Sequence, residues 1–225
     1  MKKRIILVGS SSKILDRKRG DFIDKFEHVV RFNSYKIKGY EAYVGSKEKI
    51  WASNLGLTQH RETLERYLKR NDYIWYVGSN PVTEFKIEKS LLSLKQELNR
   101  QYVAESLNFG VEDFINDIKH NFSGTNLCFE RDKIRVGKDL KYITTGLRAI
   151  FKAIERFGLV YTHGFTFYQE CGRDLKNSHY YPVDNVPKHM RKAFMESPNT
   201  EHDVDNELAV FRKLTNMGLV RPLTK

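Results

Sequence analysis

The sequence has few cysteines, few prolines and no long hydrophobic run, and each shortage excludes a class of protein. Its two cysteines, Cys128 and Cys171, lack metal-ligand spacing; they suggest reduced thiols in a cytoplasm and leave a single disulfide bridge open. Five prolines and 14 glycines in 225 residues are too few for a disordered or fibrous chain. The apolar run Ile5–Val8 is too short for a signal-peptide core or a membrane span, so we expect neither a targeting segment nor a transmembrane anchor.

Positive charge is in excess, with 39 Lys and Arg against 28 Asp and Glu and a net charge of +11. Such a balance favours anionic partners, such as nucleic acid, an anionic membrane surface or a negatively charged substrate. No run of basic residues is long enough for a binding tail, and mixed charges at 16–24 and 86–100 are typical of solvated helix faces. Nucleic acid is not expected as a partner, because the basic and aromatic modules of RNA-binding folds are absent.

The chain is long enough for one α/β domain, which we expect to cover residues 1–225. Hydrophobic residues make up 40% of it, enough for one full core, and the sequence shows no internal repeat. The runs Ile5–Val8 and His28–Asn33 predict two buried strands, and Lys49–Ala52 predicts a third. Gly9–Ser12 follows the first strand, where nucleotide-binding α/β domains place phosphate or ribose contacts, although it matches neither G-x-G-x-x-G nor a P-loop.

Asn33 is the last residue of the second predicted strand. Its amide carries both donors and an acceptor, so it could read a base or a ribose. The commoner role for asparagine after a strand is that of a turn residue, and the sequence leaves both interpretations open.

A helix followed by a strand is predicted between Tyr142 and Phe165. Gly158 ends the helix, and Leu159–Thr162 predicts the strand, the repeating unit of a parallel α/β sheet. The helix has one apolar face at i, i+3, i+4 spacing: Leu147, Ile150, Phe151, Ile154 and Phe157. Its first residues, Thr144, Thr145 and Gly146, suit a phosphate or carboxylate at the helix N-terminus, or serve only as an N-cap.

Two histidines near the C-terminus, His179 and His202, are candidates for acid–base chemistry, because histidine titrates near neutral pH. His202 stands at the start of a predicted helix, where histidine is also often a plain surface residue, and Glu207 could fix a ring or a helix start. Gly218 ends this helix and a last strand follows. The other histidines are expected to be structural or solvated: His28, His60, His120, His163 and His189.

Together these segments resemble glycosyltransferase family 29, the eukaryotic-type sialyltransferases, which are recognised by four sialylmotifs. The large motif is similar to Ile5–Trp51, and the small motif to the stretch from Thr144 to Phe165. The third motif is similar to His179-Tyr180-Tyr181, and the very small motif, His-x4-Glu, to His202 and Glu207. Within the large motif the matching segments are Val8-Gly9-Ser10-Ser11, Val30-Arg31-Phe32-Asn33, Gly39-Tyr40-Glu41 and Val44-Gly45-Ser46.

The sequence departs from the family pattern at three places. Ser10 stands where the family usually has Asn, and Thr144 stands where it usually has Ser. The cysteines that link the large and small motifs in secretory-pathway members fall at Ile5 and Phe157 here. We therefore expect a soluble bacterial or viral relative located in the cytoplasm, held at the inner membrane surface by its positive charge.

The resemblance implies an inverting, metal-independent sialyltransferase that moves sialic acid from CMP-sialic acid to a hydroxyl of a glycan or glycolipid acceptor. No cofactor or metal is expected. By the same resemblance His202 is the base, His179 holds or protonates the departing phosphate, and Glu207 supports the helix start. The implied donor contacts are Gly9, Ser10, Ser11, Asn33, Thr144, Thr145, Gly146, Gly164, Phe165, Ser178 and Tyr180.

The fold implied is a single Rossmann-like α/β domain with a parallel sheet flanked by helices, a variant of the GT-A glycosyltransferase type. Residues 52–141 carry no motif and are expected to hold much of the acceptor specificity, with a loop over the site at Asn121–Lys141, a candidate mobile lid. Two alternatives stay open: transfer of another CMP-activated ulosonic acid such as Kdo, and a nucleotide-binding module without catalysis.

Overall fold

The central element of the fold is a seven-stranded sheet in the strand order β10-β9-β1-β2-β3-β4-β5. The computed structural model describes residues 4–53, 63, 66, 73–76, 83–86, 127–130, 133–136, 141–142, 144–167, 179–181 and 204–223. The strands of this sheet are β1 (Ile5–Val8), β2 (His28–Phe32), β3 (Ile50–Ser53), β4 (Tyr73–Tyr76), β5 (Thr83–Lys86), β9 (Val160–His163) and β10 (Val220–Pro222). All neighbouring pairs are parallel except β4 and β5, so β5 is an antiparallel edge.

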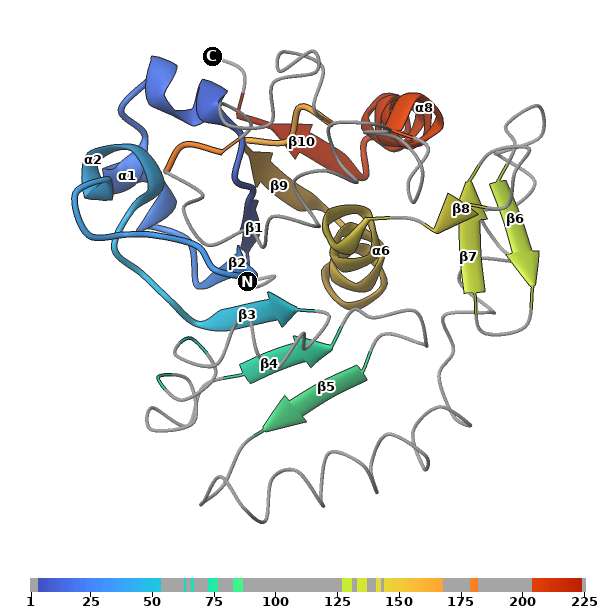
Figure 1. The fold of residues 1–225 in the computed structure, drawn as a ribbon, viewed down its shortest axis with the longest axis horizontal. Coiled ribbons are helices and arrows are strands. Elements are labelled where there is room, and N and C mark those ends of the chain that lie inside the picture. The colour runs from blue at the N-terminus through green and yellow to red at the C-terminus, as the bar shows by residue number, and fades with distance from the viewer. Residues whose placement is uncertain are drawn as a thin grey trace, which may run out of the picture.

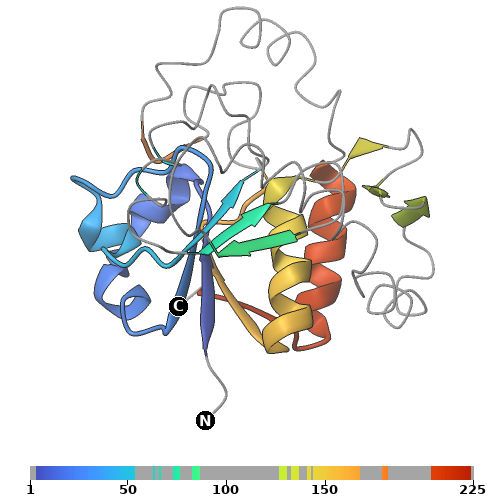
Figure 2. The ribbon, with the colours of Figure 1, turned by 90° about the horizontal axis from the view of Figure 1, so that it is seen from below.

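Helices cover both faces of the sheet (Figures 1 and 2). One face carries α6 (Thr145–Phe157) and α8 (Val204–Asn216). The other carries η1 (Ser12–Asp16), α1 (Gly20–Ile23) and α2 (Glu41–Val44). The predicted α/β class with a parallel sheet between helices is therefore confirmed.

Strand β1 divides its side chains between two hydrophobic clusters, one on each face. Ile5 and Leu7 belong to the cluster under α6 and α8, whereas Ile6 and Val8 belong to the cluster under α1 and α2. Successive side chains of a strand point to opposite faces, and all four of these are buried, so β1 reads as an uninterrupted apolar run.

Helix α6 begins and ends where the sequence predicts. Thr144 is its N-cap, with its hydroxyl oxygen accepting from the backbone N–H of Leu147, and Gly158 ends it with a positive φ of 76°. The predicted apolar face is buried through Ile154, with Phe157 packed against it. Arg148 and Lys152 are buried as well, so the helix is covered on more than its apolar face.

The prediction of a loop over Asn121–Lys141 is wrong for part of that range. The structure has a three-stranded antiparallel sheet there, with β6 (Leu127–Glu130), β7 (Lys133–Val136) and β8 (Lys141–Tyr142). Cross-strand pairs match apolar with apolar and opposite charges with each other: Leu127 with Val136, Phe129 with Ile134, and Glu130 with Lys133. The alternation of apolar and other residues along these strands is the sequence pattern that predicts them, and the polar composition of the stretch masked it.

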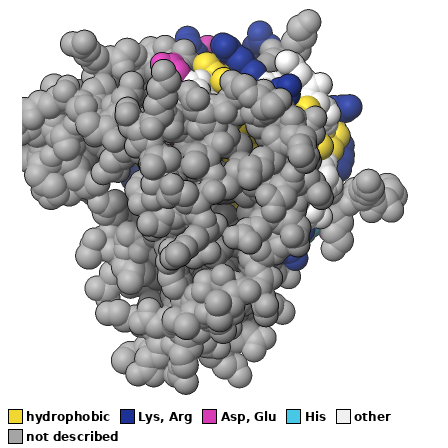
Figure 3. Space-filling view, turned by 90° about the vertical axis from the view of Figure 1, so that its right-hand side faces the viewer, with side chains coloured by type: hydrophobic (Ala, Val, Ile, Leu, Met, Phe, Trp, Pro, Cys, Tyr) yellow, Lys and Arg dark blue, Asp and Glu magenta, His cyan; other side chains and the backbone are white. Residues whose placement is uncertain are grey.

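The described surface is rich in positive charge. Most charged side chains that come to view on the face drawn in Figure 3 are Lys or Arg, in keeping with the net charge of +11. Within the described part of the chain, no helix has the length and apolar character needed to cross a bilayer.

Candidate functional site

The order of the strands marks one place where a ligand is expected. From β1 the chain adds β2, β3 and β4 on one side, and it later adds β9 and β10 on the other. The reversal lies between β1 and β9. In open parallel sheets, ligands bind outside the carboxyl ends of the strands at such a switch point. The loops that begin at Gly9 and Gly164 therefore border the candidate site.

These two loops pack backbone against backbone. The N–H of Gly9 donates to the carbonyl of His163 at 2.7 Å, and the N–H of Ser11 donates to the carbonyl of Gly164 at 3.3 Å. A side chain at Gly9 would collide with the carbonyl oxygen of Gly164. Gly164 has a φ of 71°, and a Cβ there would lie 2.6 Å from Cδ1 of Ile14. Both glycines are thus required by the close approach of the loops, whatever they do for a ligand.

A short strap, residues 179–181, crosses the β1 loop. His179 forms an antiparallel bridge with Ser11, and the N–H of Tyr180 donates to the carbonyl of Ser10 at 2.9 Å. The structure thereby brings a predicted catalytic residue beside two predicted donor contacts from the opposite end of the chain. Burial lowers the pKa of His179, so its imidazole is neutral at neutral pH in the ligand-free protein.

Tyr180 is placed differently from a ligand contact. Its side chain is 4% exposed and belongs to the cluster under α1 and α2. Its hydroxyl donates to the carbonyl of Lys36 and accepts from the N–H of Lys36 at 3.2 Å. Burial raises the pKa of Tyr180 to about 12, so the phenol remains protonated.

Glu207 lies at the start of α6 rather than at the start of its own helix. Its fully buried carboxylate accepts from the N–H of Thr144 at 2.7 Å and from the hydroxyl of Thr144 at 2.6 Å. These bonds join the small-motif and very-small-motif segments. Among the residues that the structure describes, the N–H groups of Thr145 and Gly146 have no acceptor, so they remain available at this helix end.

Phe165 packs into the core beside α6 and α8. Its ring is stacked on Phe211 at a centroid distance of 6.3 Å and meets Phe32 edge-on at 5.6 Å. A Cβ at Gly146 would lie 3.0 Å from the Phe165 ring, so this glycine lets the helix start approach the β9 loop. The ring therefore packs between the start of α6, the end of β2 and α8.

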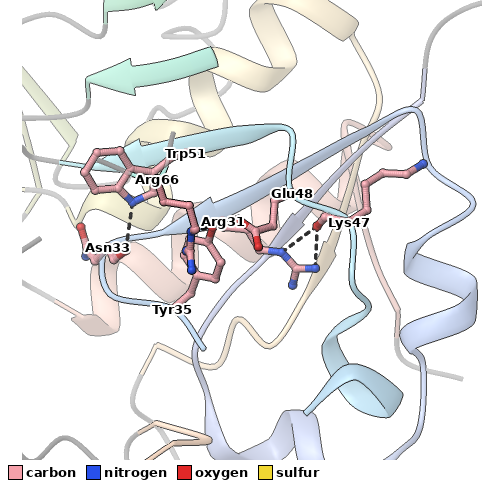
Figure 4. Close-up of polar contacts among 7 residues, drawn as sticks. All are labelled: Arg31, Asn33, Tyr35, Lys47, Glu48, Trp51 and Arg66. Carbon is pink, nitrogen blue, oxygen red and sulfur yellow. Dashed lines mark hydrogen bonds and ion pairs between the residues drawn. The ribbon is translucent and has the colours of Figure 1, made fainter. Parts of the chain in front are cut away.

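Asn33 combines a turn conformation with an unused acceptor. Its φ is 47°, its N–H donates to Ala52, and its carbonyl accepts from the indole N–H of Trp51 at 2.9 Å (Figure 4). The side-chain oxygen Oδ1 is buried without a hydrogen-bond partner. A buried acceptor at the end of β2, beside the switch point, is suited to a ligand's O–H or N–H.

Two charged side chains that sequence reasoning did not single out hold the loop before β3. Arg31, fully buried, donates to the carbonyls of Gly45 and Lys47 at 3.2 and 2.9 Å; Figure 4 shows the contact with Lys47. Asp24 accepts from the N–H groups of Ser46 and Lys47 at 2.8 Å each, and from the Ser46 hydroxyl at 2.7 Å. The signal for Arg31 was a charge inside a predicted buried strand.

The pKa of Asp24 reflects this setting. Burial alone would raise it, but the hydrogen bonds from Ser46 and Lys47 and the positive charge of Arg31 hold it below its ordinary value. Near Arg31, Tyr35 donates to Glu48, which also forms an ion pair with Arg66 at 3.4 Å (Figure 4).

His163, expected to be structural or solvated, is buried at 8% exposure at the end of β9. Burial, with the positive charges of Arg19 and Arg31 nearby, lowers its pKa to about 4. Two other predicted site residues, His202 and Ser178, lie outside the described residues.

A parallel α/β sheet whose switch point is bordered by the β1 loop, the β9 loop and the strap with His179 is the arrangement typical of nucleotide-binding α/β domains. The model of glycosyltransferase family 29 (sialyltransferase) matches residues 2–219, and the chain belongs to this family.

Curated relatives are similar along nearly the whole chain. The CMP-N-acetylneuraminate-beta-galactosamide-alpha-2,3-sialyltransferase 4 of Mus musculus is 22% identical over 228 residues, which are 99% of this chain and 64% of that protein. Its Homo sapiens counterpart is 22% identical over 227 residues, with the same coverages. The chain thus spans less than two thirds of the length of these relatives.

Solved structures share the fold. The sialyltransferase CstII from Campylobacter jejuni, in complex with the substrate analogue CMP-3FNeuAc, matches with a TM-score of 0.53 and 14% identity. The match covers 98% of this chain and 81% of that one.

Proposed function

We propose that this protein transfers sialic acid from CMP-sialic acid to a hydroxyl of an acceptor glycan, with inversion and without a metal ion. Family membership supports the reaction class. The observation that carries the proposal is that segments far apart in the sequence meet around the switch point. Gly9 contacts His163, Ser11 pairs with His179, and Gly146 approaches Phe165 at the α6 start that Glu207 holds through Thr144.

The donor is proposed to lie across the carboxyl ends of β1, β2 and β9. Ser10, Ser11 and the side-chain oxygen Oδ1 of Asn33 would contact the nucleotide. Gly9 and Gly164 would let the two loops pack closely, so that no side chain there blocks the nucleotide. The free N–H groups of Thr145 and Gly146 at the α6 N-terminus would receive the sialyl carboxylate, since the helix end favours negative charge.

Glu207 changes the expected role of Thr144. Because Glu207 already uses the N–H and the hydroxyl hydrogen of Thr144, this residue would anchor the helix start instead of contacting the donor directly. The assignments of Phe165 and Ser178 to the cytosine pocket are kept from the family resemblance, with Phe165 acting through packing. Tyr180 would pack beside the site without contacting the donor directly.

The proposed chemistry is one displacement at the anomeric carbon. The acceptor oxygen forms the new bond as the bond to the phosphate oxygen of CMP breaks, and the acceptor proton passes to His202. His179, neutral before binding, would donate a hydrogen bond to the phosphate. The donor's negative charge would raise the pKa of His179, so the ring would take up a proton from solvent and pass it to the leaving phosphate oxygen. Acid–base terms of this kind are typically worth about 10²- to 10⁴-fold in rate.

A metal ion has no part in the proposal, because protein N–H groups and His179 would neutralise the phosphate. No cluster of three or more His, Cys, Asp or Glu suited to a metal occurs within the described ranges. We further propose a single domain of the GT-A-like type over residues 1–225, in the cytoplasm, with basic side chains meeting an anionic inner membrane surface.

Calorimetric binding of CMP, with UMP, AMP and NAD alongside and EDTA present, tests the proposal. We expect selective binding of CMP, followed by transfer from CMP-sialic acid that His202→Ala abolishes while CMP binding persists. An equal response to all four nucleotides, or to none, would exclude the donor site, and full transfer by the His202→Ala variant would exclude that residue as the base.

A further inference from the structure

Residues 179–181 are joined to two loops that lie far away in the sequence. The backbone of Tyr180 bonds Ser10 in the β1 loop, and its side chain bonds Lys36, 144 positions away, in the segment after β2. The strap thus spans from the loop of one central strand to the loop of its neighbour. His179 is the residue of this strap that pairs with Ser11.

The side chain of Tyr180 is enclosed by other rings. It meets Tyr40 edge-on at a centroid distance of 5.1 Å and Tyr181 at 4.8 Å, and Tyr181 in turn meets the His179 ring at 5.3 Å. Tyr180 and Tyr181 are both buried. A ring held in this way has little freedom, so its hydroxyl keeps a fixed position relative to the backbone of the strap.

The hydroxyl of Tyr180 makes a reciprocal pair of bonds with one residue. It donates to the carbonyl of Lys36 and accepts from the N–H of the same residue, which gives both backbone groups a hydrogen-bond partner. No ligand is needed to satisfy the phenol here, because its O–H already donates to the carbonyl of Lys36.

We propose that Tyr180 is a positioning residue: by tying the strap to Ser10 and Lys36 it holds His179 over the β1 loop, and it does not itself contact the donor. The expected effect on catalysis rests on the proposed function, whereas the positioning of His179 by Tyr180 does not depend on that function. A displacement of about 1 Å at a reacting group can reduce the rate by on the order of 100-fold.

Tyr180→Phe is the decisive variant, because it removes the two bonds to Lys36 and keeps the ring. Tyr40→Phe is the matched control: it removes a hydroxyl from the same ring pair, and that hydroxyl has no partner among the described residues. We expect Tyr180→Phe to lower kcat by about 10- to 100-fold with the CMP dissociation constant changed less than about threefold. Tyr40→Phe should change neither.

A measurement without substrate separates positioning from general destabilisation. Burial lowers the pKa of His179, so a loosened strap should let that pKa return toward 6.5. NMR titration of the His179 ring should therefore show a higher pKa in Tyr180→Phe than in the wild type, and no change in Tyr40→Phe. An unchanged His179 pKa and an unchanged kcat in Tyr180→Phe, with only a lower Tm, would overturn the proposal.

Weaker CMP binding with kcat preserved would also overturn it, since that result makes Tyr180 a direct donor contact. Should Tyr180→Phe fail to fold, amide hydrogen exchange in the wild type still tests the proposal, because the N–H of Lys36 must be protected by its bond to Tyr180. Rapid exchange of the Lys36 amide would contradict the bond between the strap and Lys36. Absence of CMP binding and transfer in the wild type would remove the proposed function, while the NMR and exchange results would stand on their own.

Discussion

The two faces of the sheet are held by different forces. On one face, α6 and α8 have 13 residues each and bury apolar stripes in a large hydrophobic cluster. On the other face, α1 and α2 have only four residues each. Helices this short gain little from hydrogen bonding or apolar area. Hydrogen bonds from polar side chains, those of Asp24, Arg31 and Tyr180, hold the loops on this face instead.

The candidate site takes a contribution from each face. The α6–α8 face supplies the helix start at Thr144, secured by Glu207, and the α1–α2 face supplies the strap with His179. Removing one apolar side chain should therefore damage the first face chiefly through stability. Removing one polar anchor on the second face should damage the geometry of the site.

The largest expected effect is the loss of Phe151, which is 1% exposed on α6. Phe151→Ala should reduce the free energy of unfolding by about 3–5 kcal/mol, because it leaves a cavity in the main core. Arg212→Ala, at an exposed position of α8, is the control and should cost less than about 0.5 kcal/mol. Urea unfolding measures both, and equal midpoints would contradict an apolar origin of this face's stability.

Acid should destabilise the α1–α2 face through His163. Its pKa falls from 6.5 to about 4 on folding, so the unfolded chain binds more protons between these values. Stability is full above pH 6.5 and is lost as the pH falls toward 4, by roughly 3 kcal/mol at most for a shift of this size. His179 acts in the same direction.

Replacing His163 by Gln removes the titrating group. Thermal unfolding between pH 7 and 4.5 should show a shallower decline of Tm for His163→Gln than for the wild type. Parallel declines would mean that His163 takes up its proton in the folded state.

The loss of Glu207 tests a buried polar contact on the α6–α8 face. Glu207→Ala leaves the N–H and hydroxyl of Thr144 without their acceptor, at a cost of about 2–3 kcal/mol in unfolding free energy. Asp205→Ala, in the same first turn but exposed, should cost less than about 1 kcal/mol. If the two variants unfold at the same denaturant concentration, the buried Glu207–Thr144 bonds contribute no more to stability than an exposed carboxylate does.

A smaller effect is expected at Asp24, which is partly exposed. Asp24→Ala removes the acceptor for Ser46 and Lys47 and should cost about 1–2 kcal/mol. Asp21→Ala, an exposed carboxylate in the first turn of α1, serves as its control with an expected cost below about 1 kcal/mol. Chemical unfolding of both variants at pH 7 provides the comparison. A larger loss of unfolding free energy for Asp21→Ala than for Asp24→Ala would contradict the stabilising role given to the Asp24 hydrogen bonds.

The apolar face was largely predictable from the sequence, because its pattern is periodic. The spacing from Leu147 to Ile154 and the stops at Gly158 and Gly218 predicted α6, α8 and the strands that follow them. The strand pattern likewise located β1, β2 and β3. The spacing of apolar residues along one helix or strand depends only on neighbouring residues, so it can be recognised in a single sequence.

The polar anchors were not predictable, because each joins residues that only the fold brings together. Glu207 and Thr144 are 63 positions apart, and Tyr180 and Lys36 are 144 apart. The motif resemblance marked Glu207 and Tyr180 as important without naming their partners. The sheet of β6, β7 and β8 was missed for another reason: its alternation is short and lies in a polar stretch.

Hydrogen–deuterium exchange with and without saturating CMP, in EDTA, tests most directly whether the switch point is the nucleotide site. Binding there should slow exchange at residues 9–11 and 163–165, at the helix start 144–146, and in the strap 179–181, on both faces of the sheet at once. Protection confined to one face, or to segments away from β1 and β9, would contradict a donor site shared by the two faces.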